Sequence, residues 1–420
     1  MLQLTRVVSR IIAAIAALAL FAIVPRVGTA QTSQVGTAPA SRGNGAQAPD
    51  WTRRQPLPLP NGPFAVGTLT LRLEDWTRPT SRHIRSRPLN VQVWYPSRSA
   101  SRGPRAPYIG DRHMLDSMIG RGYLELTRDE VQPWDSVKIV ARLKAIPAKS
   151  PRRDGWPVIV FSHGMGISRA NYASYVQQLA SHGYVVLAID HPMGGFTFGT
   201  DGSVLAPGVD SVPYPYPRVL GPLLRDWAKD ASYVVRTARD ALGSSSTHGL
   251  RLALDTMRAG MAGHSLGGAA ALQACHAESL FLACADMDGD TFGDVDSDGV
   301  GKPFLTLLSK PVHMSEPEDS AGRAGRARLN QMGRERDSSW AATIAKQPGV
   351  AAYVIEIAGT GHMSFTDAPF LFPSQLQNTG STLDRTKAYD LISNRLLAFF
   401  DLYLNGKKSK KLVPGMSSIP

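Results

Sequence analysis

The chain of 420 residues is 43% hydrophobic and carries a formal net charge of +12. This apolar content is enough for a substantial core, and no zinc-finger spacing, helix-turn-helix pattern or aromatic-basic repeat accompanies the positive charge. The composition therefore excludes nucleic acid as an expected partner, and a solvated basic surface explains the charge.

The first thirty residues have the pattern of a secretory signal. Arg6 and Arg10 precede an apolar run over residues 11–24, and small residues lead to a cleavage position before Gln31. The run is short for a membrane span, which needs about 20 apolar residues. We therefore predict a signal peptide over 1–30 and a secreted or periplasmic protein, rather than one held by an uncleaved anchor.

Three further regions follow the signal. Residues 31–62 are rich in Gly, Pro, Ser, Thr and Gln, which predicts a disordered linker. A single domain is expected over 63–405, and a flexible basic tail with four lysines over 406–420. In an exported protein, such charge is compatible with peripheral contact with an anionic membrane surface. No feature of the sequence indicates an obligate protein partner.

Regular structure is predicted from Pro63 onward. Residues 64–73 and 89–96 alternate apolar and polar side chains, which indicates half-buried, antiparallel strands. Continuous apolar runs at 158–161 and 184–190 are typical of parallel strands buried on both faces, and a helical stripe over 172–179 lies between them.

Strand and helix patterns alternate through the rest of the domain. Further strands are expected at 258–263, 281–287, 303–309 and 351–359, and helices at 220–242, 269–275 and 391–400. This order predicts an α/β fold with a mostly parallel, doubly wound sheet and antiparallel strands at its start. Two segments, 191–217 and 315–339, fit poorly and are expected to be functional loops.

The stretch Gly263-His264-Ser265-Leu266-Gly267 predicts a nucleophile elbow. It lies between a predicted strand and an Ala-rich helix, which is the context that makes a G-x-S-x-G motif meaningful. The glycines leave room for a sharp turn, and the helix N-terminus favours negative charge near the serine oxygen. We therefore predict Ser265 as the catalytic nucleophile.

The general base should follow the last strand, because this kind of fold orders its residues as serine, acid and histidine. His362 follows the last predicted strand in a glycine-containing turn, so we predict it as the base. His163 and His264 are interpreted as structural residues, and His313 precedes the last strand.

The acid must accept a hydrogen bond from the histidine. Asp288 ends the strand after the nucleophile helix, Asp286 lies on the same strand, and Glu316 and Asp319 follow the next strand. The residues alone leave these four carboxylates open.

Residues 286–299 contain six aspartates and look like a calcium loop. With Asp294 as the first position of a hand-type loop, the twelfth position, which should be a bidentate carboxylate, is Leu305. A frame that starts at Asp286 places Ser297 there. Neither frame completes a calcium cage, so we predict no metal site and no cofactor, with a non-standard cation site as the alternative.

An oxyanion hole needs backbone N–H donors aimed at the developing charge. One is expected at Leu266, directly after the nucleophile, and the other at Met165, in the loop after an earlier strand.

Four stretches together resemble one known family. FSHGMGISRANYASYVQQLASHGYVVLAIDH, GHSLGGAAA, ADMDG and GTGHMSFTD are similar to the platelet-activating-factor acetylhydrolase-like branch of the α/β-hydrolases. The resemblance covers roughly residues 64–405. It implies an α/β-hydrolase fold, ester hydrolysis without a metal and a Ser265, Asp288 and His362 triad. The aspartates after Asp288 depart from the family pattern.

The predicted function is that of an exported serine carboxylic-ester hydrolase acting on short-chain acyl esters or phospholipids through an acyl-enzyme. The alternatives are a catalytically silent, calcium-dependent or metal-free binding protein on the same fold, and an amide or peptide hydrolase with the same triad. Cys275 and Cys284 either pair in an oxidising compartment or remain buried thiols.

Overall fold

The structure is a computed structural model. It describes residues 54–81, 84–99, 103–110, 116, 137–199, 202–205, 217–243, 251–311, 320–373 and 381–419. The expected signal peptide and most of the expected linker lie outside the described residues. So do His313, Glu316 and Asp319.

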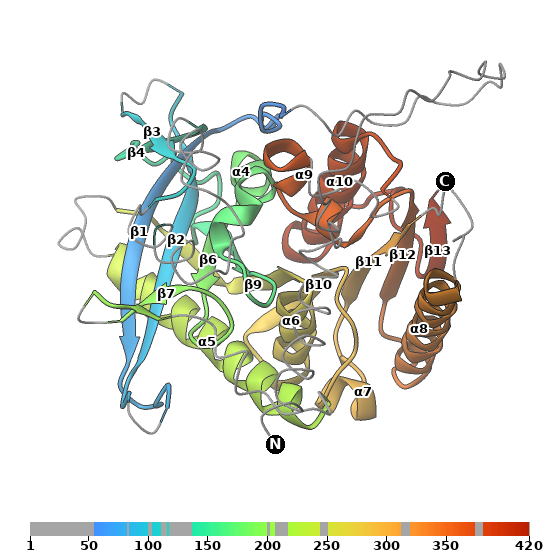
Figure 1. The fold of residues 1–420 in the computed structure, drawn as a ribbon. Coiled ribbons are helices and arrows are strands. Elements are labelled where there is room, and N and C mark those ends of the chain that lie inside the picture. Colours follow the sequence, from blue (N-terminus) through green and yellow to red (C-terminus); the bar gives the residue numbers. More distant parts are fainter. Residues whose placement is uncertain are drawn as a thin grey trace, which may run out of the picture.

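The core of the domain is one large, mixed sheet (Figure 1). Among the described residues it has eleven strands, in the order β13-β12-β11-β10-β9-β5-β6-β2-β1-β4-β3. Their bounds are β1 Ala65–Asp75, β2 Arg87–Ser97, β3 Arg105–Pro107, β4 Lys138–Leu143, β5 Trp156–Ser162, β6 Val185–Asp190, β9 Leu254–His264, β10 Phe281–Met287, β11 Phe304–Lys310, β12 Ala352–Ala358 and β13 Gly415–Ile419. A separate small hairpin pairs β7, Thr197–Phe198, with β8, Val204–Leu205.

The direction of the strands follows from their sequence patterns. β2 pairs antiparallel with both β1 and β6, whereas β6, β5, β9, β10, β11, β12 and β13 run parallel to one another. Every residue of β5 and β6 is buried, as expected for the continuous apolar runs of strands covered on both faces. The predicted α/β-hydrolase fold class is confirmed.

Helices cover both faces of the sheet (Figure 1). One apolar cluster packs one sheet face against α4 (Ala173–Ser181), α9 (Ala368–Leu371) and α10 (Arg385–Asn405). The other cluster packs the opposite face against α5 (Pro217–Gly243), α6 (Leu266–Ala277) and α8 (Ser320–Ala345), with Val295 of the short α7 (Asp294–Asp298). Two 3-10 helices, η1 (Arg169–Tyr172) and η3 (His362–Phe365), lie beside the first cluster.

The structure differs from the sequence expectations in three segments. Residues 320–345 form the helix α8, although 315–339 was expected to be a loop; the helix is mostly polar and is held by a few buried residues such as Trp340. Asn61 and Gly62 already donate backbone hydrogen bonds to side chains of α4, so the domain begins before Pro63. At the other end, residues 415–419 of the expected flexible tail pair with β12 as β13.

Candidate active site

The turn after β9 holds Ser265 in a conformation that few residues adopt. Its φ is 56° and its ψ is −125°, which costs about 1–3 kcal/mol for a residue with a side chain. A Cβ at Gly263 would overlap the backbone of Gly267, and a Cβ at Gly267 would overlap the carbonyls of Ser162 and His163. Both glycines of the motif are therefore required by close backbone approach, as the elbow predicts.

Asp288 and His362 meet at the same edge of the sheet, from the ends of β10 and β12. His362 Nδ1 lies 2.7 Å from Asp288 Oδ2, and Asp288 Oδ1 accepts a 2.6 Å hydrogen bond from the backbone N–H of Ser309. A carboxylate can only accept, so Nδ1 of His362 carries a proton, and in the neutral ring Nε2 is the nitrogen with the free lone pair.

The environment of Asp288 keeps its carboxylate charged. Burial opposes the charge, but the hydrogen bond and charge of His362, the guanidinium of Arg336 and the Ser309 N–H together lower the pKa of Asp288 to about 2. Arg336 Nη1 lies 3.6 Å from Asp288 Oδ1, and Arg336 Nη2 donates to the carbonyl of Ser309. Arg336 was not among the residues predicted from the sequence, because its segment lacks an apolar stripe and was expected to be a loop.

Ser265 lies next to this pair. Its backbone N–H donates to the carbonyl of Met287, one residue before Asp288, at 2.9 Å. The ring of the neighbouring His264 is 4.4 Å from the ring of His362, centroid to centroid. The contacts of the described residues do not include a hydrogen bond between the Ser265 hydroxyl and His362. The structure thus joins Asp288 to His362 directly and brings Ser265 beside them through the backbone.

His264 links the elbow to the loop of His362. Its Nε2 lies 3.0 Å from the carbonyl of His362, which can only accept, so Nε2 carries the proton. Its Nδ1 then accepts from the hydroxyl of Tyr172, which in turn accepts from the N–H of Gly164. Burial, followed by the charge of His362, lowers the pKa of His264 well below its usual value. A neutral, buried His264 has the geometry of a structural residue.

The two expected oxyanion donors are backbone groups in the segments that follow the adjacent strands β5 and β9. Met165 follows β5 and Leu266 begins α6. Within the described part of the chain, neither of their N–H groups has a hydrogen-bond acceptor. Two unpaired donors beside a strained serine are compatible with an oxyanion hole.

The aspartate-rich stretch is held by protein contacts. Residues 294–298 form α7, where Asp294 pairs with Arg225 and with the amide of Gln273. Asp286 is fully buried, which raises its pKa well above the usual value, and it accepts from the N–H of Gly289 rather than from His362. Among the described residues, no group of three His, Cys, Asp or Glu side chains could hold a metal ion.

Cys275 and Cys284 form a disulfide bond, with their Cα atoms 6.0 Å apart. Of the two alternatives that the sequence left open, the structure has the bridge. It joins the end of α6, the helix that starts at the nucleophile elbow, to β10, the strand that leads to Asp288.

The parallel sheet, the serine elbow and the histidine–aspartate pair at the carboxyl edge define a protein of the α/β-hydrolase class. The family model for platelet-activating factor acetylhydrolase, isoform II, matches residues 52–193 and 239–413. The chain belongs to this family, as its motifs predicted, and the family places it among the ester hydrolases.

Individual relatives agree with this assignment. A probable 1-alkyl-2-acetylglycerophosphocholine esterase from Arthroderma benhamiae is 27% identical over 266 residues, which cover 59% of this chain and 64% of that protein. A platelet-activating factor acetylhydrolase from Cavia porcellus is 23% identical over 381 residues, 84% of this chain and 79% of that protein. A solved ferulic acid esterase from Streptomyces cinnamoneus has a TM-score of 0.66 and 27% identity, and covers 86% of this chain and 97% of its own.

Proposed function

We propose that the protein is an exported serine carboxylic-ester hydrolase whose catalytic residues are Ser265, His362 and Asp288, here called the candidate triad. The observation that carries the proposal is the 2.7 Å hydrogen bond between His362 Nδ1 and Asp288 at the sheet edge beside Ser265. This contact fixes the tautomer that a general base needs, because it leaves Nε2 free to accept a proton.

In the proposed first step, His362 Nε2 takes the hydroxyl proton of Ser265 while the serine oxygen attacks the ester carbonyl. Asp288 remains ionised through this step, since its pKa is about 2, and stabilises the imidazolium that forms. The carbonyl oxygen becomes negative and accepts hydrogen bonds from the N–H groups of Met165 and Leu266.

In the following steps the imidazolium of His362 gives its proton to the leaving alcohol, and an acyl-enzyme remains on Ser265. Water then enters, His362 takes one of its protons, and the resulting hydroxide attacks the acyl carbonyl. Collapse of the second tetrahedral intermediate returns the proton to Ser265 and releases a carboxylic acid.

The names of the relatives guide the choice of substrate. The fungal and mammalian relatives are named for esters of 1-alkyl-2-acetylglycerophosphocholine or platelet-activating factor, which supports a short acyl chain on a phospholipid. The ferulic acid esterase supports esters of ferulic acid, which have an aromatic acyl group, as the competing class. A panel of acetyl, butyryl, long-chain and feruloyl esters separates them: the acetyl phospholipid should have the highest kcat/KM, and a preference for feruloyl esters would reject this assignment.

Export is supported by the disulfide, because such bonds persist mainly in oxidising compartments. No helix among the described residues has the length and apolar character needed to cross a membrane. N-terminal sequencing of the protein recovered outside the cytoplasm should begin at Gln31.

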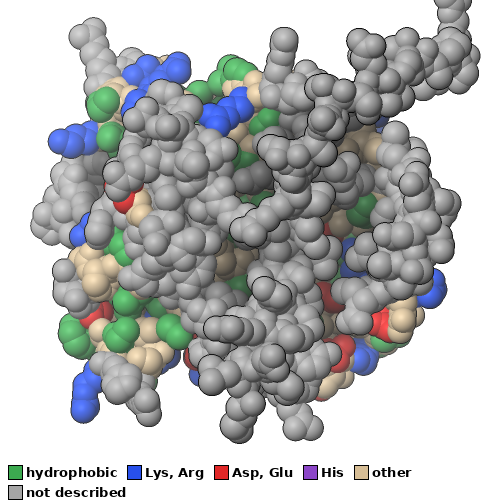
Figure 2. Space-filling model, viewed as in Figure 1, with side chains coloured by type: hydrophobic (Ala, Val, Ile, Leu, Met, Phe, Trp, Pro, Cys, Tyr) green, Lys and Arg blue, Asp and Glu red, His purple; other side chains and the backbone are tan. Residues whose placement is uncertain are grey.

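The proposal includes peripheral contact with an anionic membrane surface. Lys407, Lys408, Lys410 and Lys411 follow α10, and Lys407 is paired with Asp401. On the described surface in Figure 2, basic side chains lie at both flanks and acidic ones lie beside some of them. Sedimentation with anionic vesicles should therefore be weak and should disappear as the salt concentration rises.

The test of the reaction is a labelled fluorophosphonate, which reacts only with an activated serine. The wild-type protein should be labelled, with the label on Ser265 in peptide mass spectra, and should hydrolyse p-nitrophenyl acetate. A protein that takes no label and hydrolyses no ester would instead be a catalytically silent member of the fold.

A further inference from the structure

His163, in the loop directly after β5, makes two hydrogen bonds inside the protein. Its Nδ1 lies 2.7 Å from the carbonyl oxygen of Gly164, and its Nε2 lies 3.0 Å from the backbone nitrogen of His191. A carbonyl can only accept and a backbone N–H can only donate, so Nδ1 carries the proton and Nε2 does not. The side chain is wholly buried, and burial, with the nearby His191, lowers its pKa to about 3.

The carbonyl that His163 binds is one end of the peptide unit whose other end is the Met165 N–H. In a trans peptide these two groups point in opposite directions in one plane. A hydrogen bond that fixes the direction of the Gly164 carbonyl therefore also fixes the direction of the Met165 N–H. It also polarises the amide, because a bond to the carbonyl strengthens the N–H as a donor.

We propose that His163 is a positioning residue of the oxyanion hole: it holds and polarises the Gly164–Met165 peptide so that the Met165 N–H points at the reacting oxygen. This inference rests on the proposed function. It changes the interpretation of His163, which the sequence suggested to be a structural residue of a glycine turn.

His163 lies beside a second Ser-His-Asp arrangement, which consists of Ser162, His191 and Asp230 and is here called the buried array. The Ser162 hydroxyl lies 2.8 Å from His191 Nε2, and His191 Nδ1 lies 2.9 Å from Asp230 Oδ2. All three side chains have no exposed surface. The array has the bonding pattern of a catalytic triad without access for a substrate, so its hydrogen bonds serve to hold the backbone around His163.

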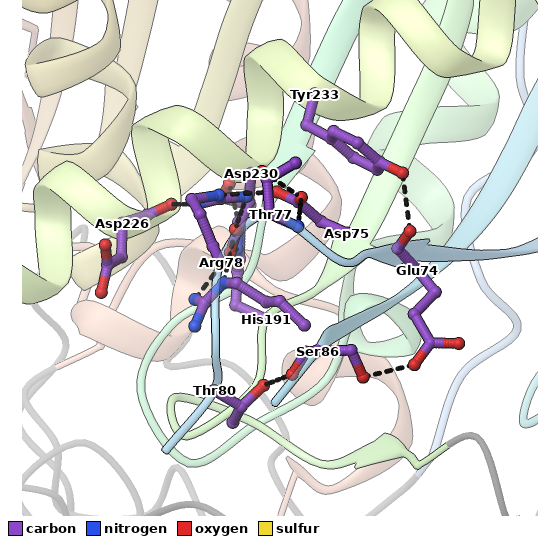
Figure 3. Close-up of polar contacts among 12 residues, drawn as sticks. Glu74, Asp75, Thr77, Arg78, Thr80, Ser86, His191, Asp226, Asp230 and Tyr233 are labelled. Carbon is purple, nitrogen blue, oxygen red and sulfur yellow. Dashed lines mark hydrogen bonds and ion pairs between the residues drawn. The ribbon is translucent and has the colours of Figure 1, made fainter. Parts of the chain in front are cut away.

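The charge of Asp230 anchors this array. Asp230 comes from α5, and Figure 3 shows the side chains of Arg78 and His191 directed toward it. Arg87 adds a two-pronged contact at 2.6 and 2.8 Å. Burial opposes ionisation of Asp230, but the charge of Arg87 and the bond from His191 lower its pKa. A fixed carboxylate sets the His191 tautomer, which makes its Nε2 the acceptor for Ser162.

The packing around His163 leaves little room for another position of the ring. His191 stacks on Trp227 with ring centroids 4.2 Å apart and planes 5° from parallel. A Cβ at Gly195 would overlap the His163 ring, and a Cβ at Gly194 would overlap Trp227. The N–H of Gly166 donates to the carbonyl of Gly194 and so holds the loop after β5 at a second point. The ring is therefore held in the orientation that serves the Gly164 carbonyl.

Two substitutions at position 163 separate its two hydrogen bonds. In His163→Asn the amide nitrogen lies where Nδ1 is, so it can still donate to the Gly164 carbonyl but leaves the His191 N–H unpaired. In His163→Gln the amide oxygen lies where Nε2 is, so it can accept from His191 but leaves the Gly164 carbonyl with only the long, 3.4 Å hydrogen bond from the N–H of Ile167. If the bond to Gly164 positions the oxyanion donor, the Asn variant should keep more activity than the Gln variant.

The readout is the ratio of kcat/KM for p-nitrophenyl acetate to that for the matching thionoacetate. The ratio reports the oxyanion hole, since sulfur is a poor hydrogen-bond acceptor, and it does not depend on the fraction of folded enzyme. In His163→Gln we expect kcat to fall by about tenfold to a hundredfold with KM little changed, and the ratio to fall as well. His163→Asn should retain a ratio close to that of the wild type.

A ratio in His163→Gln equal to that of the wild type would overturn the inference, and so would a larger loss in the Asn variant than in the Gln variant. Fluorophosphonate labelling of the wild-type protein distinguishes a failure of the role of His163 from a failure of the proposed function. If the wild type is labelled and the ratio does not move, only the role of His163 fails. If the wild type is not labelled, the proposed function fails, and the inference fails with it.

Discussion

The candidate triad and the buried array contain the same three residue types and share a histidine–aspartate hydrogen bond, but they differ in how far a substrate can reach them. In each, an aspartate binds Nδ1 of a histidine, at 2.7 Å in the candidate triad and 2.9 Å in the buried array. The side chain of His362 is 27% exposed, whereas that of His191 is not exposed at all. A substrate can reach only the first.

The second difference between the candidate triad and the buried array is the backbone conformation at the serine. Ser265 lies at a strained turn beside two unpaired N–H donors, whereas Ser162 is the last residue of the strand β5 and its hydroxyl is already bound to His191. The comparison shows that a Ser-His-Asp contact is not sufficient for nucleophilic catalysis. We infer that exposure and oxyanion donors decide the role, and we propose that the buried array supports the candidate triad.

The largest expected difference is between the two serines. Ser265→Ala removes the nucleophile and should lower kcat for p-nitrophenyl acetate by about a millionfold, while melting remains cooperative. Ser162→Ala leaves His191 Nε2 without a donor, which should cost about 1–3 kcal/mol of stability and keep kcat/KM within about tenfold. Comparable activity losses in the two variants would contradict the assignment.

The next comparison is between two aspartates on one strand end. Asp288→Asn keeps the shape but favours the wrong tautomer of His362, so kcat should fall about ten-thousandfold. Asp286→Asn is the matched control: burial raises the pKa of Asp286, which favours its neutral form, so an amide is a close replacement for it. If Asp286→Asn proves the more damaging change in steady-state kinetics, Asp286 is the acid.

A smaller effect, measured as a loss of stability, is expected from a substitution in the buried array. Asp230→Ala leaves the buried guanidinium of Arg87 without its partner and should cost about 3–5 kcal/mol of unfolding free energy in urea. Asp226→Ala, one turn earlier on α5, is the control: the carboxylate of Asp226 is only half-buried, and about 0.5 kcal/mol is expected. Equal losses would mean that the charge of Asp230 does not anchor the array.

The predictability of these two regions from the sequence differs for a physical reason. The central strands of the sheet were predicted because strands such as β5, β6 and β10 carry their signal in a few consecutive residues, whereas the strands β3, β4 and β13 near its edges were not predicted. The sequence signal of the nucleophile elbow is local in the same way, because its glycines lie in one short stretch. The fold then orders serine, acid and histidine along the chain, which predicted His362 once the strands were known. The residues alone left four carboxylates open as the acid, and the resemblance to the family selected Asp288.

The buried array could not be inferred in this way. Asp230 lies 39 residues after His191 on a helix, and Arg87 lies 143 residues before Asp230 on another strand. Only the packing of α5 on the sheet brings them together. Arg336 was missed for the same reason, since α8 has no apolar stripe and reaches Ser309 through a tertiary contact.

A second buried carboxylate sharpens the comparison, because it lacks the cations that surround Asp230. Asp367 follows η3 and has no exposed surface; it accepts from the hydroxyl and the N–H of Ser174. Burial raises its pKa to about 7, although these hydrogen bonds oppose the shift. Burial alone therefore keeps Asp367 partly protonated near neutrality, whereas Arg87 and His191 keep Asp230 charged.

The raised pKa gives Asp367 a predictable effect on stability. An unfolded aspartate has a pKa of about 3.9, so between about pH 4 and pH 7 the folded state holds a proton that the unfolded state has lost. The stability that this carboxyl contributes is full below about pH 4 and is lost as the pH rises to about 7. Asp367→Asn should remove that dependence, so urea unfolding of the variant should lose less stability over this range than that of the wild type. The exposed Asp240→Asn controls for the substitution itself. Parallel pH profiles for Asp367→Asn and the wild type would show that the carboxyl of Asp367 is already ionised at low pH, and that burial without a cation does not by itself set the charge state in this core.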